Sequence, residues 1–216
     1  MSPSALVRQA LARGLDLIAS CDHNAAENVA AVSRAAQRVG LAVIGGMEIT
    51  SREEVHVLGL FHDENTLSAA QDVVYDNLPG ENDPDAFGEQ LVTDEQDKVI
   101  GQNHRLLIGA TGLTLGEVVR TVHGLGGLAI ASHVDRPRFS VLSQLGFIPD
   151  GLSLDGAEVC SESVPGLPEG LAVVRSSDAH RLSEIGARRT RFLVEGPTAL
   201  EIGMALRGIE GRRIVA

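Results

Sequence analysis

The chain has 216 residues, which is enough for one domain with a hydrophobic core. Hydrophobic residues make up 44% and charged residues 22%, and these ordinary values exclude a largely disordered chain. The net charge of -11 and the 3% of aromatic residues argue against broad nucleic-acid binding, which uses clustered Lys and Arg or stacking rings. A small phosphorylated substrate remains compatible, because a metal cluster supplies positive charge locally.

The cysteine content and the hydropathy pattern predict a cytoplasmic protein. Cys21 and Cys160 form neither a disulfide framework nor a zinc finger, so we expect a reducing compartment. No apolar run approaches the roughly 20 residues of a membrane helix, and no signal peptide precedes the first helix. We expect no membrane association, and the oligomeric state stays open.

The first part of the chain alternates between helix and strand patterns. We expect helices over 5–13 and 24–38 and strands over 15–19, 41–44 and 55–61. Only a short polar segment, 50–54, separates the last two strands, which favours an antiparallel pair. A helix ahead of the first strand is unusual, because right-handed crossovers run from strand to helix to strand. The strand that belongs before this helix would precede Met1.

Residues 62–112 are acidic, and Pro79, Gly80 and Pro84 interrupt any long periodicity. Two interpretations remain open for them: a helical insertion at the mouth of the fold, able to act as a lid, or a solvated connection. The remaining elements are expected as helices over 114–123, 140–146 and 197–207 and strands over 127–131, 151–159, 171–174 and 190–194. We find no repeat and no domain boundary, so 1–216 is expected to be a single domain.

Four of these strands lead into an acidic residue or a histidine. The residues that follow them are Asp22 and His23, Glu48, His133, and Asp178 with His180. Such residues at the carboxyl ends of parallel strands commonly assemble one site, although Asp178 alone could simply cap a following helix. Asp and His are ligand types for divalent metals.

Three further residues have two interpretations each. His56 lies inside an apolar strand, where a histidine is usually structural, but the hairpin brings it within reach of Glu48. Arg136 and Arg138 follow His133 closely and could hold a phosphate, or could pair with a local acid.

The ordered motifs resemble those of the polymerase and histidinol phosphatase (PHP) family of metal-dependent phosphoesterases. They are Cys21-Asp22-His23-Asn24, Gly46-Met47-Glu48-Ile49, His56 in Val-His-Val-Leu-Gly, Ser132-His133 with Arg136 downstream, and Ser177-Asp178-Ala179-His180. The resemblance runs from about Pro3 to the C-terminus. It implies an α/β fold, a distorted (β/α)7 barrel, with up to three divalent metals, commonly zinc, manganese or iron.

The resemblance also implies roles for single residues. Glu48 would bridge two metals, with His56 and His133 completing one site and Asp178 belonging to the other. His23 and His180 would bind a third metal. Asp22 would orient the neighbouring ligand.

The chain departs from the family pattern at its start, because no His precedes Ser20, whereas PHP proteins begin with a strand that carries a His-x-His pair. Either this chain is a shortened version or the site is degenerate, and we favour the first, since losing a barrel strand exposes two edges. We expect fewer bound metals and impaired activity in this form.

The expected reaction is hydrolysis of a phosphoester, a small phosphorylated metabolite or a nucleotide, by a metal-activated water, with Arg136 or Arg138 holding the phosphate. Two alternatives remain. One is a degenerate domain that binds metal as a structural or interaction module, and the other is a metal-dependent amidohydrolase.

Overall fold

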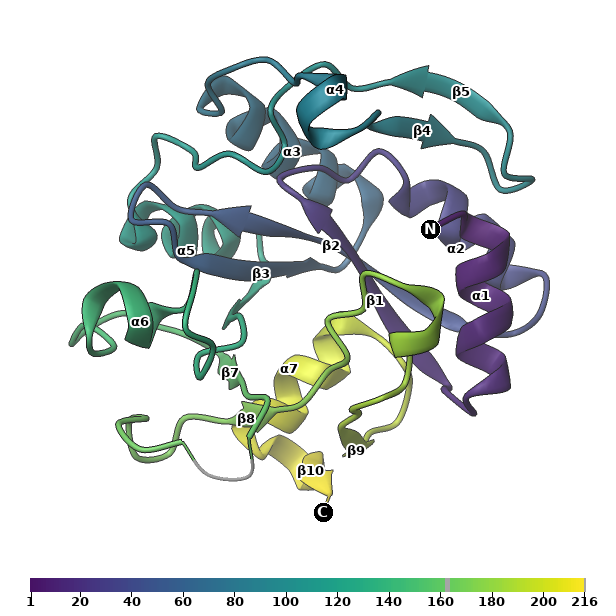
Figure 1. The fold of residues 1–216 in the computed structure, drawn as a ribbon. Helices are drawn as coiled ribbons and strands as arrows, with labels where there is room; N and C mark the ends of the chain where they lie inside the picture. The colour runs from purple at the N-terminus through teal and green to yellow at the C-terminus, as the bar shows by residue number, and fades with distance from the viewer. Residues whose placement is uncertain (162–163, 216) are drawn as a thin grey trace.

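A curled sheet of six strands forms the centre of the computed structural model, which describes residues 1–161 and 164–215 (Figure 1). In spatial order its strands are β1 (Leu17–His23), β2 (Ala42–Thr50), β3 (His56–Phe61), β6 (Leu128–Ala131), β7 (Gly156–Glu158) and β8 (Val173–Val174). Pairing is parallel except that β3 runs antiparallel to both β2 and β6. The expected hairpin between the second and third strands is therefore confirmed.

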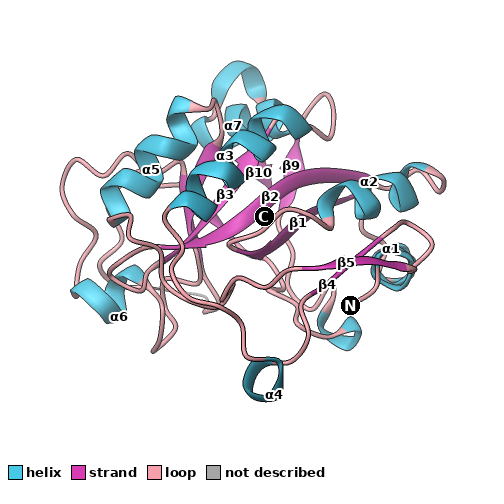
Figure 2. Cartoon of the chain, turned by 90° about the horizontal axis from the view of Figure 1, so that it is seen from above, coloured by secondary structure: helices cyan, strands magenta, loops and turns pink. Residues whose placement is uncertain are grey.

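The described chain contains seven helices. They are α1 (Pro3–Ala12), α2 (Val29–Gln37), α3 (Glu64–Asp76), α4 (Pro84–Phe87), α5 (Leu115–Gly124), α6 (Val141–Leu145) and α7 (Ala199–Arg207). Of these, α4 lies apart from the sheet (Figure 2). Within the described residues, no helix combines the length and the apolar character needed to cross a membrane.

The strands bury both faces, so most of their residues are apolar. On one face Met47 and Val57 pack with residues of α3 and α5, including Val74 and Val118. On the opposite face Ile44, Leu60 and Ile130 pack with Ile202 of α7. Because side chains alternate along a strand, the second face also carries the polar residues at the strand ends that build the site.

The outer strands leave the sheet open. Within the described chain β1 pairs only with β2, and β8 pairs only with β7. A cavity of about 420 Å³ separates these edges and is lined by Leu17 and Cys21 from one side and Val174 and Ser176 from the other. The α/β class and the curled, barrel-like sheet are confirmed, and the open half-barrel of six strands agrees with the expectation of a seven-stranded barrel that lacks its first strand.

The acidic segment is more than a helical insertion. It contains α3 and α4, as expected, but also the hairpin of β4 (Leu91–Thr93) and β5 (Val99–Gln102), which lies beside α4 and away from the main sheet (Figure 1). The Asp94 carboxylate accepts hydrogen bonds from the backbone N–H groups of Gln96 and Lys98, which forms the turn of this hairpin. This Asp-centred turn is what the purely helical expectation overlooked.

Several other elements begin or end at residues that differ from those expected from the sequence. β1 begins and ends later than the expected strand over 15–19, because its parallel pairing with β2 continues to His23 opposite Glu48. The second helix correspondingly begins at Val29 and not at residue 24. An antiparallel pair, β9 (Arg191–Leu193) with β10 (Arg213–Val215), completes the described fold; α7 connects its two strands, and β10 was not expected.

Candidate metal-dependent active site

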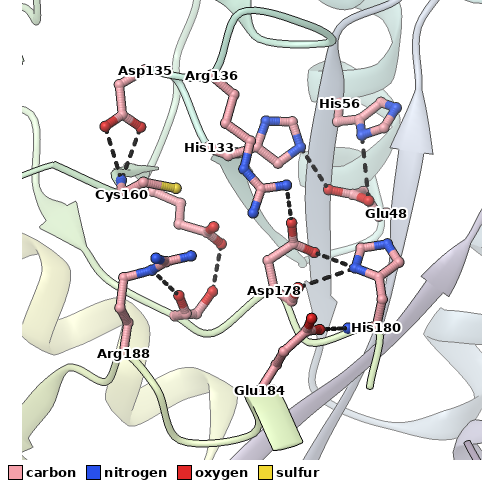
Figure 3. A network of polar contacts seen from close by, with 12 residues as sticks. Glu48, His56, His133, Asp135, Arg136, Cys160, Asp178, His180, Glu184 and Arg188 are labelled. Atoms are coloured by element: carbon pink, nitrogen blue, oxygen red, sulfur yellow. Dashed lines mark hydrogen bonds and ion pairs between the residues drawn. The ribbon is translucent and has the colours of Figure 1, made fainter. Parts of the chain in front are cut away.

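Glu48 is the centre of the site. It lies in β2 on the same face as Ile44, and only 6% of its surface is exposed. Three imidazoles surround its carboxylate: Nδ1 of His23 lies 3.1 Å and Nδ1 of His56 3.4 Å from Oε2, and Nε2 of His133 lies 3.5 Å from Oε1 (Figure 3 shows the last two). Burial alone would raise the pKa of Glu48, but the three imidazoles lower it far below its usual range. Glu48 is therefore a carboxylate at neutral pH.

The surrounding histidines come from three different strands or strand ends. His23 is the last residue of β1 and pairs in register with Glu48, whereas His56 is the first residue of β3. His133 follows β6, with a φ of 28° that a non-glycine residue rarely adopts. Because these backbone positions are fixed by the sheet, the imidazoles meet although their residues are far apart in sequence.

The donor set suits a divalent cation. His23, Glu48 and His56 offer ligand atoms that all lie within 4.8 Å of one another. Among the described residues, Nδ1 of His133 is buried without a hydrogen-bond partner, and the buried Nδ1 atoms of His23 and His56 lie near the Glu48 carboxylate without forming a hydrogen bond of good geometry. An unpaired buried nitrogen is costly, and coordination of a cation would satisfy it. The neighbouring Glu48 carboxylate raises the pKa of His23, the response expected of an imidazole beside a fixed negative charge.

Asp178 and His180 lie on the other side of the same pocket, after β8. Asp178 forms an ion pair with Arg136, and Nδ1 of His180 lies 3.7 Å from its carboxylate (Figure 3). The rings of His23 and His180 are 5.9 Å apart between centroids. His180 is also held by its backbone N–H, which donates to Glu184. The side chain of His180 remains 61% exposed, so this half of the cluster is far more open to solvent than Glu48.

A pocket of about 240 Å³ joins these groups. All six expected metal ligands line it, and so do Arg136 and Arg138. Arg138 is exposed, and no ion pair to it is found in the described part of the chain. A pocket with carboxylates and imidazoles on its floor and guanidinium groups at its rim can bind a cation together with an oxyanion.

Asp22 takes a different position from the one expected. It precedes His23 in β1, so its side chain leaves the strand on the opposite side. Its carboxylate accepts a hydrogen bond of 3.4 Å from Nδ2 of Asn28, and among the described residues no hydrogen bond joins it to His23. The expectation that Asp22 orients His23 therefore has no contact to support it.

Asn24 holds the chain where it leaves β1, a role that the sequence reasoning did not assign. It is completely buried, its Nδ2 donates to the backbone oxygens of Leu107 and Gly109 at 2.8 Å each, and its Oδ1 accepts from the N–H of Thr50. Its φ of 48° is tolerated best by Asn among the non-glycine residues. An Asn directly after a candidate ligand was the available signal.

Glu158 is a second buried acid that the sequence reasoning left without a role. It ends β7 and is 2% exposed; its Oε2 accepts a hydrogen bond of 2.6 Å from the Ser176 hydroxyl, while its Oε1 has no partner in the described chain. Burial raises the pKa of Glu158. It lines the larger cavity between β1 and β8, which also reaches Glu48 and Asp178, but it does not line the smaller pocket.

One curated protein sequence is similar to this chain. It is a 5'-3' exoribonuclease of Haemophilus influenzae, 24% identical in an alignment of 173 residues that covers 62% of this chain and 63% of that protein. The chain thus spans less than two thirds of this relative. No protein-family model matches the chain.

Solved structures with the same fold are found at low sequence identity. The lesion-specific endonuclease PfuEndoQ of Pyrococcus furiosus matches 99% of this chain and 53% of its own length, with a TM-score of 0.72 and 17% identity. A candidate metal-dependent phosphoesterase of Bifidobacterium adolescentis matches over 95% and 91%, with a TM-score of 0.56 and 20% identity.

A third structure with this fold is described as PHP-like. It is a two-domain protein of Bacteroides vulgatus containing a predicted PHP-like metal-dependent phosphoesterase, with a TM-score of 0.54, 18% identity and coverage of 99% of this chain and 59% of that one. The overall fold of this chain is therefore shared with these proteins. The chain has the PHP-like metal-dependent phosphoesterase fold.

Proposed function

We propose that the protein hydrolyses a phosphoester of a nucleotide or of a nucleic-acid end, with a divalent metal held at Glu48. The observation that carries this proposal is the buried Glu48 carboxylate with three imidazoles within 3.5 Å of it, below a rim that bears Arg136 and Arg138. A bound divalent cation would act as a Lewis acid on the phosphate and lower the pKa of a coordinated water.

The residues divide into two roles. Glu48, His56 and His133, with His23, would hold the cation, since they supply the buried carboxylate and the buried imidazole nitrogens. As the family resemblance implies, Asp178 would serve a second cation that Glu48 bridges to the first, and His180 would serve a third cation on the open side of the pocket. Arg138 would bind a phosphate oxygen. Arg136 would bind one as well, after giving up part of its ion pair with Asp178.

The choice of substrate rests on the relatives and on the size of the pocket. The curated relative is an exoribonuclease, and one structure of Endonuclease Q contains a 27-mer duplex substrate with an abasic lesion at the active site. This chain spans only about half of Endonuclease Q and carries a net charge of -11, which disfavours a long electrostatic footprint on nucleic acid. A pocket of about 240 Å³ fits one phosphate with its neighbouring groups. We therefore propose a mononucleotide or a terminal nucleotide as the substrate.

Hydrolysis by metal-stripped protein with added Mn²⁺, Zn²⁺ or Fe²⁺ tests the proposal. The substrates are bis(p-nitrophenyl) phosphate, a nucleoside monophosphate, a 5'-phosphorylated oligonucleotide and, as the amidohydrolase control, a p-nitroanilide. The variant His56→Asn removes one imidazole from the cluster, and His104→Asn is its matched control, because His104 is exposed and lies outside the pocket. We expect metal-dependent phosphoester hydrolysis that falls about 100-fold or more in His56→Asn and is unchanged in His104→Asn.

The other outcomes separate the alternatives. Metal binding without hydrolysis of any phosphoester would favour the structural or interaction module. Cleavage of the p-nitroanilide in preference to the phosphoesters would favour the amidohydrolase.

A further inference from the structure

Phe139 occupies an unusual position at the rim of the pocket. Its φ is 57°, in the left-handed region that bulky side chains rarely adopt. Its backbone oxygen accepts a hydrogen bond of 2.9 Å from the N–H of His56, and the next residue, Ser140, donates from its hydroxyl to the Arg136 oxygen. The loop from Arg136 to Ser140 is thus tied to β3 and held in this conformation. Unfavourable backbone conformations that are fixed by their surroundings cluster at functional sites.

The two faces of the Phe139 ring have different surroundings. One face stacks on the His56 imidazole, with the ring centroids 4.8 Å apart and the planes within 9° of parallel. The residue is nevertheless 38% exposed and lines the pocket together with Arg136 and Arg138. Among the described residues no other aromatic ring is recorded against it. Part of this apolar aromatic residue is therefore exposed to solvent beside the groups proposed to bind phosphate.

The chain uses aromatic residues sparingly, with five Phe, one Tyr and no Trp. Only histidine rings and Phe139 bring aromatic character to this pocket within the described chain. A residue that only supported the His56 ring would need an apolar side chain, but it would not need a flat face exposed to solvent. A planar face next to arginines matches a ligand in which a flat ring system lies one sugar away from a phosphate.

We propose that Phe139 stacks against the nucleobase of the nucleotide whose phosphate lies in the pocket, and so selects nucleotides over other phosphorylated compounds. This inference rests on the proposed function, because it assumes that the phosphate binds beside the metal cluster. It makes Phe139 a specificity residue that takes no part in the chemistry at phosphorus.

The test compares two ligands that differ only in the base. The Kd values of the non-hydrolysable phosphonate analogues of adenosine 5'-monophosphate and of methyl ribofuranoside 5-phosphate are measured by calorimetry with the Mn²⁺-loaded protein. In the wild type we expect the nucleotide to bind about tenfold more tightly. In Phe139→Leu, which keeps an apolar side chain without a flat face, this ratio falls to about one, whereas Phe139→Tyr, which keeps the ring, retains it. The Mn²⁺-dependent rise in Tm of each variant reports whether the fold and the cation site are intact.

The results distinguish the inference from the function on which it rests. If Phe139 only supports His56, Phe139→Leu weakens both ligands in equal proportion and the ratio persists, which overturns the inference. A wild-type ratio near one, or no binding of either ligand, overturns it as well. Hydrolysis of bis(p-nitrophenyl) phosphate measured alongside remains the separate test of the proposed function.

Discussion

Replacing Glu48 by Gln should abolish the stabilisation of the protein by a divalent cation. The substitution keeps the shape of the side chain but removes the negative charge that lies within 3.5 Å of all three imidazoles. Two unit charges 4 Å apart interact by about 4 kcal/mol at an effective dielectric constant of about 20, so the loss of this charge should weaken cation binding at least 100-fold.

The expected size of the effect follows from mass action. At Mn²⁺ concentrations 100 times the wild-type Kd, binding stabilises the native state by about 2.7 kcal/mol, which for a chain of this length raises the Tm by about 5–11 °C. With a Kd raised 100-fold, Glu48→Gln at the same concentration gains only about 0.4 kcal/mol, or about 1 °C.

The assay is differential scanning calorimetry of chelator-treated protein with and without Mn²⁺, each variant compared with its own metal-free form. Glu201→Gln is the matched control, because it makes the same chemical change in α7, where Glu201 pairs with Arg212 at 3.1 Å outside the pocket. Retention of half or more of the wild-type shift in Glu48→Gln would show that the cation binds elsewhere.

Three further predictions follow from single contacts. Arg138→Ala should raise KM for a phosphoester about tenfold with little change in kcat, since this exposed side chain would contact only the phosphate; an unchanged KM in steady-state kinetics would remove Arg138 from the site. Asn24→Ala should lower the free energy of unfolding by about 3 kcal/mol in urea titrations, because two backbone oxygens and one N–H lose their buried partner; a loss below about 1 kcal/mol would contradict that role. Arg212 lowers the pKa of Glu201, so this carboxylate stabilises the fold above the unfolded carboxyl pKa of about 4.3, and the contribution is lost as the pH falls through the lower folded pKa. Glu201→Gln should therefore show a weaker dependence of its urea midpoint on pH between 3 and 5 than the wild type, and identical pH profiles would contradict the assignment.

The site could be anticipated from the sequence because its residues follow strand patterns. Glu48 and His56 share a face with apolar residues of their strands, and the alternation of side chains along a strand makes this visible without coordinates. His133 and Asp178 follow buried apolar runs, where the ends of parallel strands meet. The short polar connection before β3 correctly predicted an antiparallel neighbour, which is what brings His56 opposite Thr50 and near Glu48.

Other features could not be predicted because they depend on tertiary contacts. The length of β1 is set by its pairing with β2, and apolar periodicity alone placed its end too early. The position of Phe139 depends on a left-handed backbone conformation and on a hydrogen bond to His56, neither of which has a sequence pattern. Asp22 looked suited to orient His23 because the two are adjacent, yet adjacent residues of a strand point to opposite sides.

Anomalous diffraction from crystals of the protein soaked in Mn²⁺ tests the central claim most directly. We predict a strong anomalous peak within coordination distance of Glu48, His56 and His133, and the loss of this peak in Glu48→Gln crystals treated identically. Diffraction of the same quality with no peak among these residues, or with a peak bound elsewhere on the molecule, would contradict the metal centre and the phosphoesterase function built on it.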